Sequence, residues 1–528
     1  MKKRFFAALL CLCLLAAALP TATLAADPHD HTGWTELTAE STQTYVSADG
    51  KYALGDGNYY LGENVQGDFT VDGTVTLCLN GYTITGTGSG SVITVNSGTF
   101  TLTDCSEGET GKVTGGKANG NGVNYGGGVY VKYSEEVYES GGATFILEGG
   151  SITGNTAAFG GGVAVENGNH FIMNGGSITD NDFSNSGGGV YVAYLKATFT
   201  MFDGTIANNI GTDEYTTGGG VYATSNFTMN GGTITGNEAR RGGGGVYSSE
   251  NFIMNGGSIT GNTANALGGG VYILRSSSFT MDGGTISDNF VYNSGGGVYL
   301  DESGSFTMSS GTITGNSAGS FGGGVYSLGT FTMTGGSITG NNAGTGGGVY
   351  VGSDVGYGNS ILTLSGAVQI KDNVCNGTKG SNGNYSGGTT SNVYLRSGKT
   401  ITIGTNHLSS DASIGVTTQD LPTNEDIAIA TGANLDDKQY FHSDTGENYL
   451  FYVTSDGTIC MTTANAHGHP ICGASCSHNG SSHTDQNWQP IGSTEELTAI
   501  QNTPSPAVRS SASRRRTPPA PRQRQSPL

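Results

Sequence analysis

The residue types that most often bind metal ions gather near the end of the chain, within residues 467–483. They are His467, His469, Cys472, Cys476, His478 and His483. A Cys-x3-Cys pair flanked by histidines can hold zinc in tetrahedral geometry. The same spacing fits a Cys472–Cys476 disulfide, which would occupy both thiols. The segment therefore predicts either a structural zinc, the only cofactor that the sequence indicates, or a disulfide.

A second pair of cysteines, Cys78 and Cys105, lies 27 residues apart. This separation matches the period of the repeat described below, so the two residues fall at equivalent positions of neighbouring units. Thiols at such positions can form a disulfide in an oxidising compartment. The alternative is a pair of buried thiols.

A tyrosine follows the motif Gly-Gly-Gly-Val in nearly every repeat unit. The series comprises Tyr130, Tyr191, Tyr222, Tyr247, Tyr272, Tyr299, Tyr326 and Tyr350, and Ala164 interrupts it. The residue after an inward-facing valine points outward in a strand, so we expect an exposed aromatic stripe. Aromatic rings suit the apolar faces of sugars, which makes these tyrosines candidate glycan contacts. The alternative is that they stack on one another only to stabilise a sheet.

Carboxylates that could cleave a glycan do not cluster in the sequence. A lyase needs grouped carboxylates that hold Ca²⁺, and a hydrolase needs two carboxylates beside the glycosidic bond. The acidic pairs Glu135-Glu136, Asp213-Glu214 and Asp436-Asp437 are far apart along the chain. We therefore expect a non-catalytic protein, with a polysaccharide lyase or glycoside hydrolase on the same fold as the alternative.

The elements that must position these residues come from an internal repeat. The valine of its motif recurs at positions 129, 163, 190, 221, 246, 271, 298, 325 and 349. A period of this size indicates a solenoid or an array. Each unit holds three short runs of β-branched or aromatic residues separated by Gly, Asn and Ser, which predicts three strands.

Strands stacked unit on unit form a parallel β-helix, with equivalent side chains about 4.8 Å apart along its axis. In one unit we expect Val221, Phe227, Met229 and Ile234 to face the interior. The asparagine that closes each third strand predicts an interior ladder: Asn155, Asn181, Asn209, Asn237, Asn262, Asn289, Asn316, Asn341 and Asn373. One unit alone buries too little apolar surface to offset its conformational entropy, so the units must stack.

The repeat also divides the chain into segments. Three basic residues before an apolar run with a small-residue end predict a signal peptide at 1–25. We then expect a polar linker at 26–58, capping coils at 59–116, regular coils at 117–374, C-terminal coils with a cap at 375–463, the Cys/His-rich segment at 464–491 and a disordered tail at 492–528. The tail is rich in Arg, Pro and Ser, which suggests a truncated or frame-shifted end.

The formal net charge is −20. Basic residues concentrate at both ends, so the body between them is more acidic still. An acidic body disfavours nucleic acid and anionic membrane surfaces as partners. No segment after the signal peptide is apolar enough to cross a membrane. We expect a secreted or cell-surface location, and a polysaccharide or glycoprotein surface as the partner.

The repeat resembles those of a known group of proteins. Three stretches carry the resemblance, each after Gly-Gly-Gly-Val: Phe171-Ile-Met-Asn174, Phe227-Thr-Met-Asn230 and Phe252-Ile-Met-Asn255. They resemble the Phe-x-x-Asn and Gly-Gly-Ala-Ile repeats of polymorphic outer-membrane adhesins. More broadly, residues 60–463 resemble right-handed β-helix repeat proteins that bacteria export. The resemblance implies a right-handed, single-stranded, pectate-lyase-like parallel β-helix and adhesion at the cell surface. The segments without the repeat motif add irregular capping coils at both ends of this solenoid.

Overall fold

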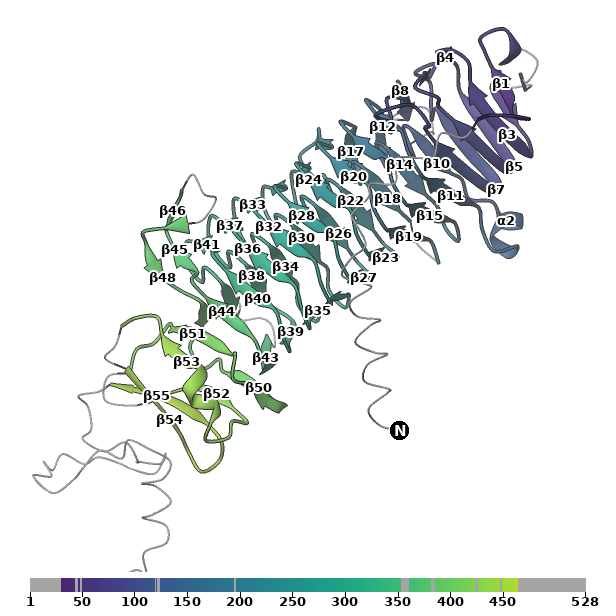
Figure 1. The fold of residues 1–528 in the computed structure, drawn as a ribbon. Helices are drawn as coiled ribbons and strands as arrows, with labels where there is room; N and C mark the ends of the chain where they lie inside the picture. The colour runs from purple at the N-terminus through teal and green to yellow at the C-terminus, as the bar shows by residue number, and fades with distance from the viewer. Residues whose placement is uncertain are drawn as a thin grey trace, which may run out of the picture. The chain divides into compact units, whose positions relative to one another are not determined.

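The computed structural model describes residues 30–463, apart from 43–45, 48–49, 119, 121–123, 194–195, 353–359, 381–384, 423–425 and 447–448. Within this part of the chain the fold is all-β. Short strands of successive coils pair in parallel and form a β-solenoid of about 14 turns (Figure 1). The predicted parallel β-helix is confirmed, and the handedness of its coil stays a prediction.

Each regular coil contains four strands, one more than the sequence predicted. In one coil these are β22 (Val221–Ala223), β23 (Asn226–Met229), β24 (Thr233–Thr235) and β25 (Glu238–Ala239). The first three belong to a 42-stranded sheet and the fourth to a separate 11-stranded sheet. The fourth strand escaped prediction because it is two residues long and buries a single small side chain.

The strands equivalent to β22 contain the valine of the motif: β10 (Val129–Val131), β14 (Val163–Val165), β18 (Val190–Val192), β26 (Val246–Ser248), β30 (Val271–Ile273), β34 (Val298–Leu300), β38 (Val325–Ser327) and β42 (Val349–Val351). Those equivalent to β23 are β11 (Thr144–Leu147), β15 (His170–Met173), β19 (Thr198–Met201), β27 (Asn251–Met254), β31 (Ser278–Met281), β35 (Ser305–Met308), β39 (Thr330–Met333) and β43 (Ile361–Gly366).

The strands equivalent to β24 are β12 (Ser151–Thr153), β16 (Ser177–Thr179), β20 (Thr205–Ala207), β28 (Ser258–Thr260), β32 (Thr285–Ser287), β36 (Thr312–Thr314), β40 (Ser337–Thr339) and β44 (Gln369–Lys371). The 11-stranded sheet adds to β25 the strands β9 (Lys117–Ala118), β13 (Thr156–Phe159), β17 (Asp182–Ser186), β21 (Ile210–Gly211), β29 (Thr263–Ala264), β33 (Phe290–Val291), β37 (Ser317–Ala318), β41 (Asn342–Ala343), β45 (Val374–Cys375) and β48 (Thr389–Thr390).

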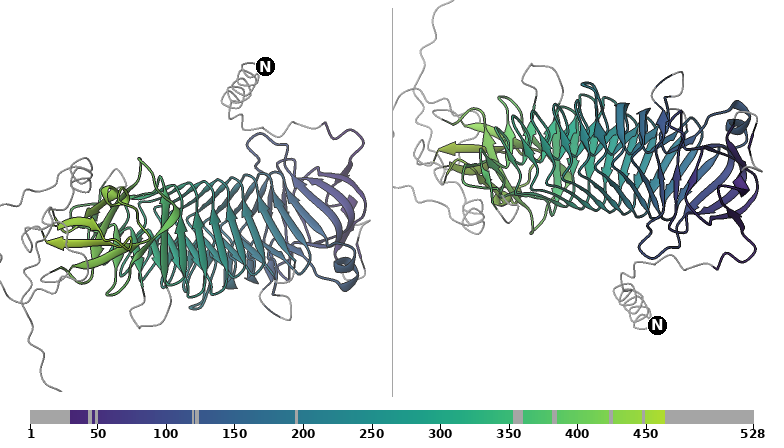
Figure 2. Two further views of the ribbon diagram at one scale, coloured as in Figure 1. Left: turned by 90° about the horizontal axis from the view of Figure 1, so that it is seen from below. Right: turned by 90° about the horizontal axis from the view of Figure 1, so that it is seen from above.

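Identical residues of neighbouring coils lie side by side, as the two views of Figure 2 show for the strands. Val221 pairs with Val246, and Phe227 pairs with Phe252. The phenylalanine rings from Phe199 to Phe331 stack at centroid distances of 4.6–4.9 Å. The valine, phenylalanine, methionine and isoleucine positions of each coil are fully buried, which confirms the predicted interior face.

The glycines before each valine meet two separate requirements. Gly243 has a φ of +65°, in the left-handed region that favours glycine. Gly245 has a steric role instead, because a Cβ there would lie 2.7 Å from the carbonyl oxygen of Gly270 and 2.8 Å from Cγ2 of Ile259. The motif therefore lets the backbones of successive coils approach each other and the interior side chains.

The predicted asparagine ladder is confirmed. Its nine members are 0–1% exposed. Oδ1 of Asn262 accepts hydrogen bonds from the backbone N–H of Asn237 at 3.0 Å and from its Nδ2 at 2.9 Å. Nδ2 of Asn262 donates in turn to Oδ1 of Asn289 at 3.0 Å and to the carbonyl oxygen of Ile234 at 2.9 Å. The ladder thus satisfies buried backbone groups that would otherwise lack partners.

The ladder ends on a carboxylate. Asn373 donates to Oδ1 of Asn392, and Asn392 donates from its backbone N–H and from Nδ2 to Asp444 at 2.7 and 2.6 Å. The backbone N–H and Nδ2 of each asparagine donate to Oδ1 of the asparagine in the next coil. The last position of the ladder therefore needs a side chain that only accepts hydrogen bonds. An ionised aspartate meets this requirement.

The solenoid begins earlier than predicted. Its first strands are β1 (Thr35–Leu37), β2 (Tyr52–Leu54), β3 (Gly57–Leu61), β4 (Val65–Gln66), β5 (Phe69–Cys78), β6 (Thr83–Thr85), β7 (Ile93–Thr103) and β8 (Lys112–Thr114). β1 pairs in parallel with β3, and Leu37 and Leu54 are buried in the core. The prediction of a polar linker at 26–58 is wrong, because two short strands without the repeat motif already belong to the sheet.

The last coils become irregular. Their elements are β46 (Thr378–Lys379), β47 (Tyr385–Ser386), β49 (Val393–Leu395), β50 (Ile401–Leu408), β51 (Ser413–Thr418), β52 (Ile427–Thr431), η2 (Asp437–Tyr440), β53 (Phe441–Ser443), β54 (Tyr449–Val453) and β55 (Ile459–Thr463). β49 continues the first-strand ladder in register, with Tyr394 opposite Tyr350. β54 and β55 pair antiparallel near the end of the described range. No helix among the described residues has the length and hydropathy to cross a membrane, and α2 (Glu135–Glu139) has five residues.

Candidate functional site

The tyrosine series faces away from the core, as predicted, but it is not an exposed stripe. Tyr247, Tyr272, Tyr299 and Tyr326 are 7–9% exposed, and Tyr350 is 2% exposed. Neighbouring rings lie 4.7–5.5 Å apart from Tyr191 to Tyr350. The expectation of an exposed aromatic stripe is therefore wrong for most of its length, and glycan contact by these tyrosines stays a prediction.

Apolar side chains on both sides bury the tyrosine rings. Leu267 and Phe321 stand directly before the glycine motif, and Leu274 and Leu328 follow the Val-Tyr strands; all four pack against the tyrosine cluster. The residues directly before the motif also form a bridge ladder of their own. The sequence did not indicate this cover, because these loop positions vary from coil to coil.

The gap at Ala164 is filled from another part of the coil. The ring of Phe159 lies 5.1 Å from that of Tyr125 and 5.2 Å from that of Tyr191. Phe159 and Tyr125 pack on the cluster that contains Ala164 and Tyr191. An aromatic contact therefore crosses the interruption, which supports a packing role for the series.

Burial controls the acidity of these phenols. It raises the pKa values of Tyr272 and Tyr299 far above the ordinary value, and the nearby Asp301 carboxylate raises both further. The Tyr272 hydroxyl donates to Oδ2 of Asp301 at 3.2 Å. These tyrosines therefore remain neutral at physiological pH.

A surface cavity of about 540 Å³ lies where a long loop leaves the regular repeat. It is lined by Thr212, Glu214, Tyr215, Arg240, Arg241, Asn265 and Ala266. The loop follows β21, and nine residues separate that strand from Val221, whereas six separate β25 from Val246. The cavity therefore forms across three successive coils at an insertion, and the regular positions of the repeat do not supply it.

The loop is tied to the neighbouring coil by one buried side chain. Oγ1 of Thr216 accepts a hydrogen bond from the backbone N–H of Arg240 at 2.9 Å, and its carbonyl oxygen accepts one from Arg241 at 2.8 Å. The same hydroxyl donates to the carbonyl oxygen of Asp213 at 3.1 Å. These bonds hold the arginine pair beside Tyr215, which is 72% exposed.

The cavity brings together two guanidinium groups, one carboxylate and an exposed aromatic ring. Nε of Arg240 donates to the carbonyl oxygen of Gly211 at 3.4 Å and lies 3.7 Å from a carboxylate oxygen of Glu238. Glu214 is the one carboxylate among the lining residues. Cleavage of a glycosidic bond ordinarily needs two carboxylates on either side of it, and the lining does not provide them. The two guanidinium groups can donate hydrogen bonds to a polar ligand, and the exposed phenol ring can stack on a ring of that ligand.

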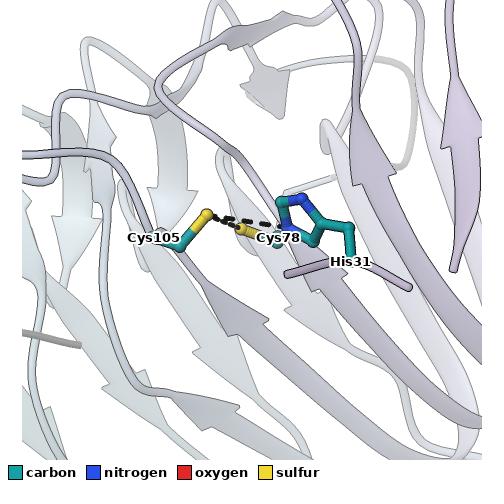
Figure 3. A group of neighbouring side chains, drawn as sticks. All are labelled: His31, Cys78 and Cys105. Atoms are coloured by element: carbon teal, nitrogen blue, oxygen red, sulfur yellow. Dashed lines mark hydrogen bonds between the residues drawn. The ribbon is translucent and has the colours of Figure 1, made fainter. Parts of the chain in front are cut away.

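A second cluster lies at the N-terminal end of the solenoid, around Cys78 and Cys105 (Figure 3). Both cysteines are free thiols, and their sulfur atoms are 3.2 Å apart. The predicted proximity is confirmed, whereas a disulfide stays a prediction. Nε2 of His31 lies 3.6 Å from Sγ of Cys105, and the three ligand atoms all fall within 4.8 Å of one another.

Burial raises the pKa of Cys78 to about 12, and its hydrogen bond to Cys105 adds to this effect. The Cys78 thiol therefore keeps its proton at neutral pH unless a cation displaces it. The sequence did not indicate His31 as a ligand, because this residue lies in the segment 26–58 that the sequence predicts to be a linker.

The remaining sequence predictions fall on residues outside the described range. They are the signal peptide at 1–25, the disordered tail at 492–528 and the candidate zinc ligands His467, His469, Cys472, Cys476, His478 and His483. Each of these stays a prediction.

Comparison with known proteins gives no relative: no family model matches the chain, and neither the curated proteins nor the solved structures yield a match. The sequence did contain a signal for the cavity. Arg240-Arg241 is the single adjacent basic pair within residues 117–374, and it follows the long loop by one coil. A basic pair inside an acidic repeat is a departure that periodicity does not explain.

Proposed function

We propose that this protein is an exported, non-catalytic binding scaffold of the cell surface, and that the cavity beside Tyr215 contacts a glycan of a host or neighbouring surface. The observation that carries the proposal is the exposed ring of Tyr215 beside the guanidinium groups of Arg240 and Arg241 in one cavity. The resemblance to exported β-helix adhesins supports the same function.

The chemistry of the cavity favours a glycan that contains an acidic sugar. The ring of Tyr215 offers an apolar face for a sugar ring, and each arginine offers a planar set of donors for a carboxylate. Asn265 adds an amide that can pair with hydroxyl groups. A charge-assisted hydrogen bond contributes about 1.5–3 kcal/mol, so one arginine contact changes affinity by about tenfold or more.

The charge of the whole chain limits the kind of acidic glycan. A net charge of −20 repels a dense polyanion at long range. The two arginines create a local exception that is suited to a single acidic sugar, such as a terminal residue. We therefore expect isolated sugar acids to bind better than sulfated or phosphorylated polymers.

The fold supports binding because the cavity is largely preformed. The backbone of Arg240 and Arg241 is fixed by Thr216, and the β-strands on either side lie in continuous parallel ladders. A preformed site loses little conformational entropy when the ligand binds. The repeat thus acts as a rigid support for one irregular loop.

A glycan array tests the proposal with the full chain and three variants. We expect Tyr215→Ala and Arg241→Ala to lose binding to acidic glycans by about tenfold or more. Tyr292→Ala is the matched control, since Tyr292 is 64% exposed and lies outside the cavity. Equal signals from Tyr215→Ala, Tyr292→Ala and the unchanged chain would remove the cavity from the proposal. New reducing ends or unsaturated products after incubation with polysaccharides would instead favour the enzyme alternative.

A further inference from the structure

Three ligand-type side chains converge at the N-terminal end of the solenoid, although they are distant in sequence. Sγ of Cys105 lies 3.2 Å from Sγ of Cys78 and 3.6 Å from Nε2 of His31, which is 74 residues away along the chain. Figure 3 shows the imidazole ring directed at the two sulfur atoms. Cys78 ends β5, Cys105 follows β7, and His31 precedes β1, so each residue comes from a different coil.

We propose that His31, Cys78 and Cys105 form a binding site for a thiophilic divalent cation, with Zn²⁺ as the expected occupant. Two cysteine sulfurs and one histidine nitrogen are ligands that zinc accepts, and the three leave one tetrahedral position for water. Zinc–sulfur distances of about 2.3 Å and zinc–nitrogen distances of about 2.0–2.1 Å imply sulfur–sulfur and sulfur–nitrogen separations of about 3.8 and 3.6 Å in a tetrahedral site. The distance between Sγ of Cys105 and Nε2 of His31 already agrees, and the two sulfurs need to separate by about 0.6 Å.

Neighbouring groups hold the three ligand residues in place. The buried carboxylate of Asp104 accepts hydrogen bonds from the backbone N–H groups of Gly81 at 2.8 Å and Ser106 at 3.1 Å. It thereby ties the turn after Cys78 to the turn that carries Cys105. The imidazole of His31 stacks on the ring of Tyr60 at 4.3 Å, with 6° between their planes.

A Cys78–Cys105 disulfide is the competing explanation. It would account for the short distance between the sulfurs but not for the imidazole placed against them. A disulfide needs no third ligand, whereas a metal site needs at least three. The presence of His31 therefore favours the cation over the disulfide.

Metal binding must also displace thiol protons. Cysteine binds zinc as the thiolate, so binding of Zn²⁺ releases thiol protons and the apparent affinity should increase with pH. This proton release gives a readout that a purely structural cysteine pair would not produce.

Titration with Zn²⁺ and Co²⁺ tests the site in the full chain, reduced beforehand and with Cys472→Ser and Cys476→Ser introduced to remove the other candidate cluster. We expect one equivalent of Zn²⁺, sulfur-to-cobalt charge-transfer absorption, and affinity that rises with pH. His31→Asn and Cys78→Ser should each weaken binding by at least about tenfold. Asparagine suits position 31 because its φ there is 48°, a conformation that asparagine tolerates.

The control is Cys460→Ser, which changes a buried cysteine outside the cluster and should leave the titration unchanged. Circular dichroism verifies that each variant keeps its β-structure. Bound Zn²⁺ should also slow oxidation of Cys78 and Cys105. The inference is overturned if folded His31→Asn and Cys78→Ser bind as much zinc as the parent, if no stoichiometric binding occurs, or if a Cys78–Cys105 disulfide forms equally fast with and without zinc.

Discussion

Replacing one interior asparagine should open the solenoid locally, and Asn262→Ala is the sharpest case. The change removes the oxygen that accepts from the backbone N–H and from Nδ2 of Asn237, at 3.0 and 2.9 Å. It also removes the donor to the carbonyl oxygen of Ile234 at 2.9 Å. Asn262 is completely buried, so water does not replace these partners without opening the coil.

The magnitude follows from the number of groups left without a partner. Both donors of Asn237 lose a hydrogen bond, and so do three acceptors, which are Oδ1 of Asn289 and the carbonyl oxygens of Ile234 and Thr260. Each buried group that is left unsatisfied costs about 1–3 kcal/mol. We expect the free energy of local opening to fall by at least about 3 kcal/mol, which corresponds to roughly 100-fold faster amide exchange in the surrounding coils. A linear array opens locally, so the effect should weaken with distance along the solenoid axis.

Hydrogen exchange measured by mass spectrometry resolves this effect coil by coil. The matched control is Asn255→Ala, because Asn255 also bonds the equivalent asparagine of a neighbouring coil, with its Nδ2 donating to Oδ1 of Asn230 at 2.8 Å, but in an exposed position. We expect that control to change stability by no more than about 0.5 kcal/mol. If the two variants exchange alike, burial of the ladder does not carry the stability that we assign to it.

Three further perturbations test other parts of the account. Asp444→Asn should destabilise the C-terminal coils by about 1–3 kcal/mol, since an amide nitrogen would face the donors of Asn392. Burial raises the pKa of Asp444 above its ordinary 3.8, so its contribution to stability is present at low pH and is lost as the pH rises through the folded-state pKa. Urea midpoints of the parent and of Asp444→Asn, measured across pH, should differ by an amount that falls as the pH rises. A difference that does not change with pH contradicts this expectation. Gly245→Ala should cost about 1–3 kcal/mol in urea unfolding, because its methyl group would press on the Gly270 carbonyl and on Ile259. Gly55→Ala is the matched control, because its methyl group would enter open space at a position without a positive φ. Alkaline titration followed by tyrosine absorbance should show Tyr272 and Tyr299 ionising only with unfolding, and reversible ionisation of every tyrosine in the folded protein at the ordinary pKa would show that the series is exposed.

The interior of the solenoid could be predicted because the same side chains occupy the same positions in every coil. Val221, Phe227, Met229, Ile234 and Asn237 repeat with their spacing almost unchanged, and all five are buried as expected. Identical residues stack only where neighbouring coils have the same register, so the period of the sequence predicts which side chains pack together.

The outer surface could not be predicted in the same way. The tyrosines repeat as regularly as the valines, yet Leu267, Leu274, Phe321 and Leu328 pack against them from irregular loops. Those loops differ in length and composition, so no periodic signal links them to the tyrosines. The pattern determined the direction of each ring, while the loops determined its exposure.

The sequence by itself determined the coil, its interior and the asparagine ladder, since each of these follows from local alternation and a repeated register. Only the tertiary structure decided which surface groups meet. It buried the tyrosines, placed Tyr215 beside Arg240 and Arg241, and carried His31 to Cys78 and Cys105. The physical reason is that winding the chain brings residues of different coils within a few ångströms, and where the coils are irregular no spacing in the sequence specifies which residues those are.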